Sequence, residues 1–342
     1  MTDIPQVSSL SRQVIAEVER AVVGKRALLE MMMASVLAGG HILLEDFPGL
    51  GKTLVARSFA RVLGLAFKRI QFTPDLLPGD ITGGYIYNRT KSEFELRKGP
   101  IFANIVLADE INRASPKTQS ALLEAMQEGQ VTIEGETLSL PVPFLVLATQ
   151  NPIEYEGTFP LPEAQLDRFL FKLTMGYMNR ESEVEVMFDN QVQLAIEDLG
   201  AVTETKTVQQ MIAYATTVNL APDVAYYIVD LVQATRDDPS LSLGASPRAS
   251  IALLRASRAL AASDGRTDVY PDDVRAVLQP IMSHRVFMNP DAVLRGETIE
   301  SVMERVVGRV KPPSGARSAT SAAPARERTR RKASRKAVRA AS

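Results

Sequence analysis

The chain has 342 residues, enough for two compact domains, and its 45% hydrophobic and 23% charged content is typical of globular proteins. It contains no cysteine and only two histidines, which excludes disulfides, thiolate zinc sites, cysteine nucleophiles and a histidine-rich metal centre. The net charge of −1 hides an asymmetry: nine of the 39 Lys and Arg but one of the 40 acidic residues lie in 317–342, which leaves a body of −9 and a tail of +8.

From about residue 7 to residue 177, apolar runs alternate with helical patterns, which predicts a parallel sheet covered by helices. The expected core strands are Ile42–Glu45, Phe67–Phe72, Ile105–Ala108, Phe144–Ala148 and Phe169–Leu173. Ser115-Pro116 and Gly129 are typical of the start and end of a helix over Lys117–Glu128. Gln130–Leu140 predicts a β-hairpin, and 75–100 is interpreted as an insertion.

Beyond about residue 179 the strand signals fade and helical periodicity dominates. The expected helices are Glu183–Gln193, Val208–Thr217, Pro222–Arg236, Pro247–Ser263 and Pro271–Arg285. We therefore predict an α/β domain over 1–178, with its insertion at about 74–100 and its hairpin at about 130–140, followed by a small all-α domain over 179–310. The remaining residues, 311–342, lack apolar periodicity and are expected to be disordered.

The segment Glu45–Thr53 lies between a predicted strand and a predicted helix, which is the order of a phosphate-binding P-loop. In such a loop, main-chain N–H groups and the helix N-terminus hold polyphosphate, while Lys neutralises the outer phosphates and the hydroxyl reaches Mg²⁺. The strict pattern has Gly where this chain has Asp46. A glycine turn with a solvated lysine is the alternative. The candidate nucleotide-binding residues are Pro48, Gly49, Leu50, Gly51, Lys52, Thr53 and Leu54.

Polar residues follow two other predicted strands. Asp109 and Glu110 come after Ile105–Ala108, and Asn151 comes shortly after Phe144–Ala148. Because Mg²⁺ prefers oxygen ligands, Asp109 and Thr53 are the candidate metal ligands. Glu110 is the candidate residue that polarises the attacking water, and Asn151 the one that holds it. An exposed acidic strand end and an Asn-Pro turn are the alternatives.

Longer stretches of the sequence carry a family resemblance. They are 75–83 (DLLPGDITG), 109–114 (DEINRA), 117–126 (KTQSALLEAM), 148–154 (ATQNPIE) and 161–169 (LPEAQLDRF). Together they resemble the MoxR family of AAA+ ATPases over roughly residues 7–310. The fold implied is a P-loop AAA+ αβα sandwich with a parallel central sheet and a small all-α lid domain. The family that the chain resembles also has Asp in place of the first P-loop glycine, as at Asp46 here.

The resemblance implies roles for particular residues. Lys52 and Thr53 would form Walker A, Asp109 and Glu110 Walker B, and Asn151 sensor 1. Arg168 resembles the arginine finger that reaches the γ-phosphate of a neighbouring subunit, and Arg248 resembles the sensor-2 arginine. Val23 and Gly24 lie where AAA+ proteins pack adenine. The alternatives are an Arg168 salt bridge with Asp167, a capping role for Arg248, and a strand-to-helix turn at Val23-Gly24.

The function implied is hydrolysis of ATP with Mg²⁺ by a ring, expected to be hexameric, that remodels or activates a client protein in a chaperone-like way. A protein with a von Willebrand factor A domain is the implied client, because relatives often act on such proteins. The alternative is an ATPase tethered to nucleic acid or to an anionic membrane surface by the basic tail, although the tail has no aromatic residue for base stacking.

The first residues have neither a basic start nor an apolar signal core, and no apolar run reaches about 18 residues, the length needed to span a membrane. With the absence of cysteine, this pattern predicts a cytoplasmic protein.

Overall fold

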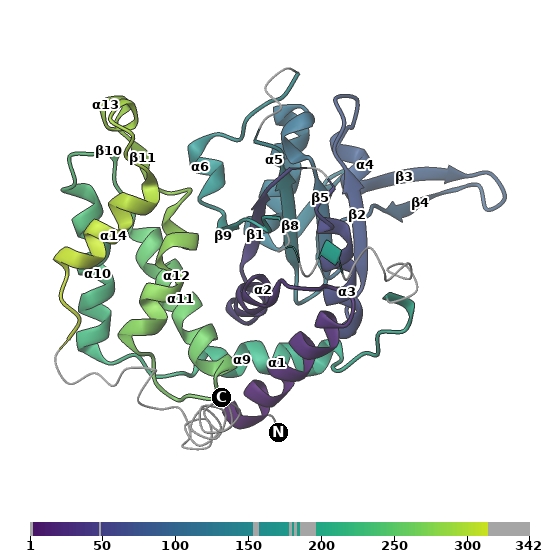
Figure 1. Ribbon diagram of the computed structural model, residues 1–342. Helices are drawn as coiled ribbons and strands as arrows, with labels where there is room; N and C mark the ends of the chain where they lie inside the picture. Colours follow the sequence, from purple (N-terminus) through teal and green to yellow (C-terminus); the bar gives the residue numbers. More distant parts are fainter. Residues whose placement is uncertain are drawn as a thin grey trace.

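A five-stranded parallel sheet with the strand order β2-β5-β8-β1-β9 forms the centre of the computed structural model (Figure 1). The structure describes residues 3–47, 49–152, 157–177, 180, 183–184 and 196–313. The strands are those expected from the sequence, with ends shifted by at most one or two residues. They are β1 (His41–Glu45), β2 (Phe67–Gln71), β5 (Ile105–Asp109), β8 (Leu145–Gln150) and β9 (Phe169–Leu173).

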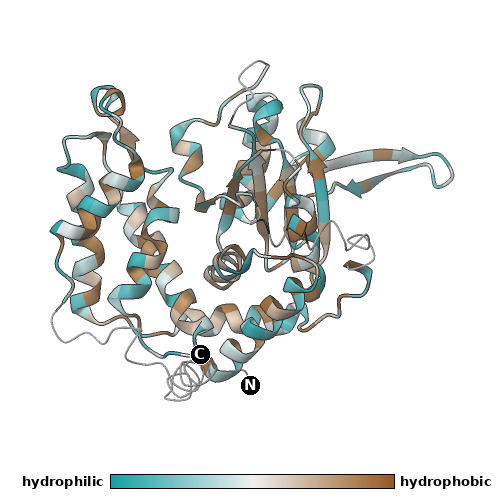
Figure 2. Cartoon of the chain, viewed as in Figure 1, coloured by the Kyte–Doolittle hydropathy of each residue, from teal (hydrophilic) through white to brown (hydrophobic). Residues whose placement is uncertain are grey.

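Helices cover both faces of the sheet, because alternate strand residues point into two different cores. On β1, Ile42 and Leu44 belong to one core and Leu43 to the other. The helices of the first core include α1 (Ile4–Glu19), α2 (Arg26–Ala38) and α3 (Lys52–Val62), and α5 (Pro116–Glu128) lies in the second. This is the αβα sandwich that the resemblance implied. In Figure 2 hydrophobic residues are brown along β1 and β9, and the helices around the sheet show both brown and teal residues.

The start and end of α5 follow the local signals in the sequence. The Ser115 side chain accepts a hydrogen bond from the Thr118 main-chain N–H at the first turn. Gly129 ends the helix with φ of 64°, a left-handed conformation that glycine adopts without steric cost.

Two hairpins extend from the sandwich. One consists of β3 (Gly83–Asn88) and β4 (Glu93–Lys98), which follow the short helix α4 (Pro78–Thr82) and form a ribbon that projects from the body (Figure 1). The other consists of β6 (Gln130–Ile133) and β7 (Glu136–Ser139). At the base of the ribbon the two strands approach closely: a Cβ atom added to Gly83 would lie 2.1 Å from the carbonyl oxygen of Arg97.

The second half of the chain is mainly helical and packs against α1 and α2 through α9 and α11. Its helices are α9 (Thr205–Thr216), α10 (Pro222–Arg236), α11 (Pro247–Ser263), α12 (Pro271–Met282), α13 (Pro290–Leu294) and α14 (Ile299–Arg309). The prediction that α12 continues to Arg285 is wrong, and the strands β10 (Leu241–Leu243) and β11 (Phe287–Met288) were not expected.

Some predictions concern residues that the structure does not describe. Most of the expected helix Glu183–Gln193 and the basic tail from residue 314 lie outside the described ranges. The domain limits at 178 and 310 stay predictions. Within the described ranges, every helix is too short or too polar to traverse a lipid bilayer.

Candidate nucleotide-binding site

A cavity of about 420 Å³ lies at the carboxyl ends of the central strands. It is lined by Gly49, Gly51, Lys52, Thr53, Arg69, Asp109, Glu110, Thr149 and Asn151. These residues come from the loop after β1, the start of α3, strand β2 and the ends of β5 and β8. In open α/β sheets, ligands bind in the crevice beyond the carboxyl ends of the strands. The cavity therefore brings together the candidate residues of the P-loop, the strand-end acids and Asn151.

The loop after β1 places Lys52 and Thr53 in the first turn of α3. Gly51 is the N-cap of this helix, with φ of 89°. A side chain at that position would be strained, which is why the turn needs glycine. The ammonium of Lys52 donates a 2.5 Å hydrogen bond to the carbonyl oxygen of Asp46. Burial lowers the pKa of Lys52, and the charges of Asp46, Asp109 and Glu110 act in the opposite direction.

Two other candidate loop residues, Leu50 and Leu54, do not line this cavity. Leu50 lies in the turn, and Leu54 packs partly buried against the first core. Pro48 lies outside the described residues. The free N–H groups at the start of α3 and the positive end of its dipole make this part of the cavity suited to an anion.

Thr149, at the end of β8, holds the two acids at the end of β5. Its hydroxyl donates to Asp109 Oδ1 at 2.7 Å and accepts the main-chain N–H of Glu110 at 2.8 Å. Glu110 has φ of 57°, an uncommon conformation for a residue other than glycine. The buried hydroxyl and the unusual backbone turn keep both carboxylates directed at one cavity.

Strand β2 adds two residues that the sequence did not identify as site residues. Arg69 Nη2 lies 2.6 Å from Asp109 Oδ2, and Gln71 Nε2 donates to Glu110 Oε2 at 2.7 Å. The two side chains share one face of β2, because residues two apart in a strand point the same way. This alternation was a usable signal, but only together with the pairing of β2 and β5, which the sequence did not reveal.

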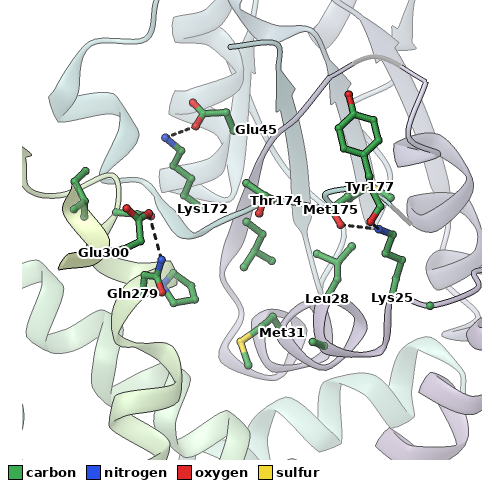
Figure 3. A pocket seen from close by; sticks show the side chains of 16 residues that line it. Lys25, Leu28, Met31, Glu45, Lys172, Thr174, Met175, Tyr177, Gln279 and Glu300 are labelled. Carbon is green, nitrogen blue, oxygen red and sulfur yellow. Dashed lines mark hydrogen bonds and ion pairs between the residues drawn. The ribbon is translucent and has the colours of Figure 1, made fainter. Parts of the chain in front are cut away.

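A second cavity, of about 550 Å³, lies between α2, the end of β9 and the helical part of the chain (Figure 3). Gly24, Lys25, Met31, Tyr177 and Gln279 are among the residues that line it. Gly24, with φ of 71°, lies in the turn between α1 and α2. The alternative of a strand-to-helix turn at Val23-Gly24 is therefore wrong, because helices flank this turn on both sides. Val23 does not line either cavity.

Arg168 and Arg248 lie together at the other edge of the sheet. They line a third cavity, of about 440 Å³, which shares no lining residue with the cavity of Lys52 at the carboxyl ends. Arg168 directly precedes β9, whose first residue Phe169 pairs with His41 at the amino end of β1. Lys52 follows the opposite end of β1, so the length of a strand, roughly 15 Å, separates the two regions. Within one protomer these arginines do not reach the cavity of Lys52.

The contacts of the two arginines differ from the alternatives considered. Arg168 Nη1 donates to the carbonyl oxygen of Leu123 at 2.5 Å, whereas Asp167 pairs with Arg285 at 2.7 Å and with Arg248 at 3.5 Å. The alternative of an Arg168–Asp167 salt bridge is therefore wrong. Ser246, not the Arg248 side chain, caps α11.

Comparison with known proteins agrees with this geometry. Residues 41–171 match the family described as "ATPase family associated with various cellular activities (AAA)", and residues 233–306 match the AAA lid domain. The structure is similar to that of a proposed ATPase from Cytophaga hutchinsonii, with a TM-score of 0.85 and 41% identity over 91% of this chain and 97% of that one. The fold is thus that of an AAA+ ATPase with an all-α lid.

Relatives define the family within this class. The chain is 44% identical over 317 residues to Chaperone MoxR1 of Mycobacterium tuberculosis, covering 90% of this chain and 83% of the relative. It is 50% identical over 299 residues to YeaC of Bacillus subtilis, an uncharacterized protein, covering 87% and 93%. It is 30% identical to Protein MoxR of Methylorubrum extorquens over 86% of this chain. The chain belongs to the MoxR family of AAA+ ATPases.

Proposed function

We propose that the protein is an ATP-hydrolysing ring motor that remodels or activates a client protein. The observation that carries this proposal is the convergence of Lys52, Thr53, Asp109, Glu110 and Asn151 on one cavity, with two arginines at the opposite edge of the same sheet. ATP is the substrate that suits this arrangement, because its polyphosphate needs N–H donors and cations while its hydrolysis needs a polarised water.

The phosphates of ATP would lie against the loop after β1. Main-chain N–H groups at the start of α3 would bind the phosphate oxygens, and Lys52 would leave the Asp46 carbonyl to neutralise the outer phosphates. The remaining loop residues proposed for binding, Pro48, Leu50 and Leu54 among them, would contribute main-chain atoms. The adenine would lie near Val23 and Gly24, in the direction of the second cavity.

Thr53 and Asp109 would hold Mg²⁺. They line the same cavity, and their hydroxyl and carboxylate oxygens are the donors that this ion prefers. Mg²⁺ would take its other ligands from phosphate and water. The bound ion would neutralise charge that develops on the phosphates.

Glu110 would orient and polarise the attacking water, and Asn151 would hold that water in line with the γ-phosphate. Arg168 and Arg248 would act on the nucleotide of a neighbouring protomer, since neither reaches the cavity of its own chain. In related NTPases an arginine supplied in this way is worth about 10³–10⁵ in rate. Ring assembly, which we expect to be hexameric, is therefore part of the catalytic mechanism.

A client protein is supported by the name of the mycobacterial relative, Chaperone MoxR1. We propose a separate polypeptide with a von Willebrand factor A domain, as the family resemblance implies. We propose that the hairpins β3–β4 and β6–β7 take part in such a contact. Tyr85, Tyr87 and Phe94 on the first hairpin have exposed aromatic rings.

The first test separates nucleotide binding from hydrolysis. Lys52→Ala should abolish ATP binding in calorimetry. Glu110→Gln should bind ATP as the wild type does and lose turnover by about 100-fold or more, because the general base is gone. Glu304→Gln, which changes an exposed acid on α14, should behave as the wild type. Wild-type turnover by Glu110→Gln would remove Glu110 from the mechanism.

The second test concerns the client. Glu110→Gln loaded with ATP should retain the client in a pull-down, and Lys52→Ala under the same conditions should not, because it cannot enter the ATP-bound state. Equal recovery of a von Willebrand factor A-domain protein by both variants would argue against ATP-dependent remodelling.

A further inference from the structure

Asp46 occupies the position at which a strict P-loop has glycine, and its side chain does not point into the phosphate cavity. The residue is only 6% exposed. Its carboxylate accepts hydrogen bonds from the main-chain N–H groups of Met175 and of Gly176, the second at 3.2 Å. Both donors lie just after β9. Asp46 therefore connects the start of the P-loop to the residues through which the chain leaves the sheet.

Lys25 binds the same segment through its carbonyl oxygens. Its ammonium donates to the carbonyl oxygens of Met175, Gly176 and Tyr177 at 2.8, 2.8 and 3.0 Å. Figure 3 shows Lys25 beside Met175 and Tyr177 among the residues that line the second cavity. An ammonium has three N–H groups, so its donors are fully used. Burial lowers the pKa of Lys25, and the nearby Asp46 carboxylate acts in the opposite direction.

We call Met175–Tyr177 the β9 exit segment. Two of its main-chain N–H groups are bound by one buried carboxylate, and three of its carbonyl oxygens by one buried ammonium. The Phe47 ring, one residue after Asp46, stacks on the Tyr177 ring with the centroids 6.1 Å apart. Tyr177 is 75% exposed, whereas Met175 is 7% exposed and belongs to the first core. Core packing therefore holds the start of the exit segment, and the polar and ring contacts hold the rest.

The P-loop lysine also contacts Asp46. Lys52 Nζ donates to the Asp46 carbonyl oxygen, so Asp46 is bound at its carbonyl by the phosphate-binding lysine and at its carboxylate by the exit segment. The Asp46 N–H also donates to the Gln150 carbonyl oxygen at 3.2 Å. When Lys52 turns to a phosphate, the main chain of Asp46 loses the hydrogen bond at its carbonyl and keeps the one at its N–H. Because hydrogen bonds to charged groups depend strongly on distance and angle, a small shift of Asp46 weakens its bonds to the exit segment.

We infer that Asp46 is a positioning residue that couples nucleotide occupancy of the P-loop to the β9 exit segment, with Lys25 as its fixed counterpart. The inference rests on the proposed nucleotide site. The inference also accounts for the departure from the strict P-loop. A glycine at position 46 could form the turn, but it has no side chain to bind the exit segment, through which the chain continues toward the lid helices.

Amide hydrogen exchange on the full-length protein, with and without ADP, tests the coupling. In the wild type, ADP should accelerate exchange at Met175 and Gly176 by about tenfold, the effect of weakening hydrogen bonds to a charged group. Asp46→Gly should still bind ADP in calorimetry. In this variant the Met175 and Gly176 amides should exchange fast without ADP, and adding ADP should change their exchange rates little. If Asp46 only stabilised the fold, Asp46→Gly would change the stability of the protein. ADP would then change exchange at the two amides equally in the wild type and in the variant.

The control is Glu93→Gln on the projecting ribbon. Glu93 is exposed and lines neither the cavity of Lys52 nor the second cavity, so this variant should keep the full wild-type response to ADP. If Asp46→Gly does not bind ADP, Asp46→Asn replaces it: one acceptor oxygen remains, and exchange without ADP should be faster than in the wild type.

The possible results distinguish failure of the proposed function from failure of the coupling through Asp46. A wild type that does not bind ADP would remove the proposed function itself. A wild type that binds ADP with unchanged or slower exchange at Met175 and Gly176 would overturn the coupling alone. A full wild-type response in an Asp46 variant that binds ADP would also overturn it.

Discussion

At the residue scale, the hydroxyl of Thr149 determines where two acids point. The residue is 1% exposed, and its single oxygen serves both Asp109 Oδ1 and the Glu110 N–H. A buried N–H without a partner costs about 1–3 kcal/mol. The left-handed backbone of Glu110 adds to this cost. Loss of the hydroxyl would therefore let both carboxylates move.

We predict that Thr149→Val, which keeps the shape and removes the hydroxyl, lowers the turnover of ATP by about tenfold or more, the equivalent of the lost hydrogen bonds. Binding of ADP should change little, because Lys52 and the loop are intact. Steady-state turnover and calorimetry measure the two effects. Thr132→Val on the exposed hairpin is the control, and unaltered turnover in Thr149→Val would show that the acids are held by other contacts.

His41 gives a prediction for pH dependence. It is buried between Met126 and Val146, with Nε2 3.0 Å from the Met126 carbonyl oxygen and Nδ1 accepting the Val146 N–H. Burial lowers the pKa of His41 to about 4, from its ordinary 6.5. As pH falls through this window, the unfolded chain takes up a proton that the folded His41 does not, so the folded state loses stability.

Between pH 7.0 and 5.5 the loss from His41 should be about 1.2 kcal/mol in the free energy of unfolding. Urea unfolding of the wild type and of a His41 variant at the two pH values measures it as the difference between their losses. The comparison is needed because the buried His284, whose pKa burial lowers to about 3, contributes to both. His41→Asn, which offers an oxygen in place of Nδ1, should be destabilised at pH 7.0 but lose less on acidification than the wild type. An identical loss in both proteins would contradict the assignment.

The sequence indicated much of the candidate site at the carboxyl ends of the strands, because the patterns that reveal it lie within short segments. A strand followed by acids or Asn predicts the carboxyl edge of a parallel sheet, which is where Asp109, Glu110 and Asn151 lie. Arg69 could not be found in this way, since its contact with Asp109 depends on which strand neighbours β5. The side-chain use of Asp46 depends on a segment 129 residues away and was equally invisible.

At the element scale, a buried joint fixes the lid helices to the sheet. Arg285, three residues beyond the end of α12, has a side chain that is 4% exposed and binds Asp167 at 2.7 Å. It also donates to the carbonyl oxygens of Phe169 and Leu170 at 2.6 and 3.1 Å. The predicted helix to Arg285 was too long because helical periodicity does not reveal that these residues leave the helix to reach β9.

Short elements were missed for a related reason. β10 and β11 have three and two residues and pair across more than 40 positions of sequence. Segments this short carry no periodicity, so only the tertiary pairing defines them.

We predict that Arg285→Met lowers the free energy of unfolding by about 3 kcal/mol or more, because Asp167 loses its buried partner. The urea unfolding midpoint measures this loss. Arg295→Met, which breaks the exposed pair with Glu297, should cost less than about 1 kcal/mol. Equal costs for the two variants would mean that the joint contributes no more than a surface ion pair.

At the scale of the whole molecule, the cavity of Lys52 and the cavity of Arg168 lie at opposite edges of one sheet. Under the proposed function, each protomer would carry an incomplete site at each edge. Head-to-tail assembly would complete the sites, because a heterologous interface that closes generates a ring.

We predict that Arg168→Ala and Lys52→Ala, each inactive alone, recover part of the ATPase activity when mixed under conditions that form mixed rings. Some interfaces then join an intact Lys52 cavity to an intact Arg168. Mixing Lys52→Ala with Glu110→Gln is the control and should recover nothing, since every cavity remains defective. No gain in the first mixture would argue that Arg168 does not act between protomers.

The close approach at the base of the β3–β4 ribbon limits where this protein can diversify. A methyl group at position 83 would overlap the main chain of the opposite strand, so only glycine fits at this position at the base of the ribbon. Ile86, Tyr87 and Phe94 in the outer half of the ribbon are exposed. Substitutions in the outer half of the ribbon can therefore change what it contacts, while the αβα sandwich below it keeps its structure.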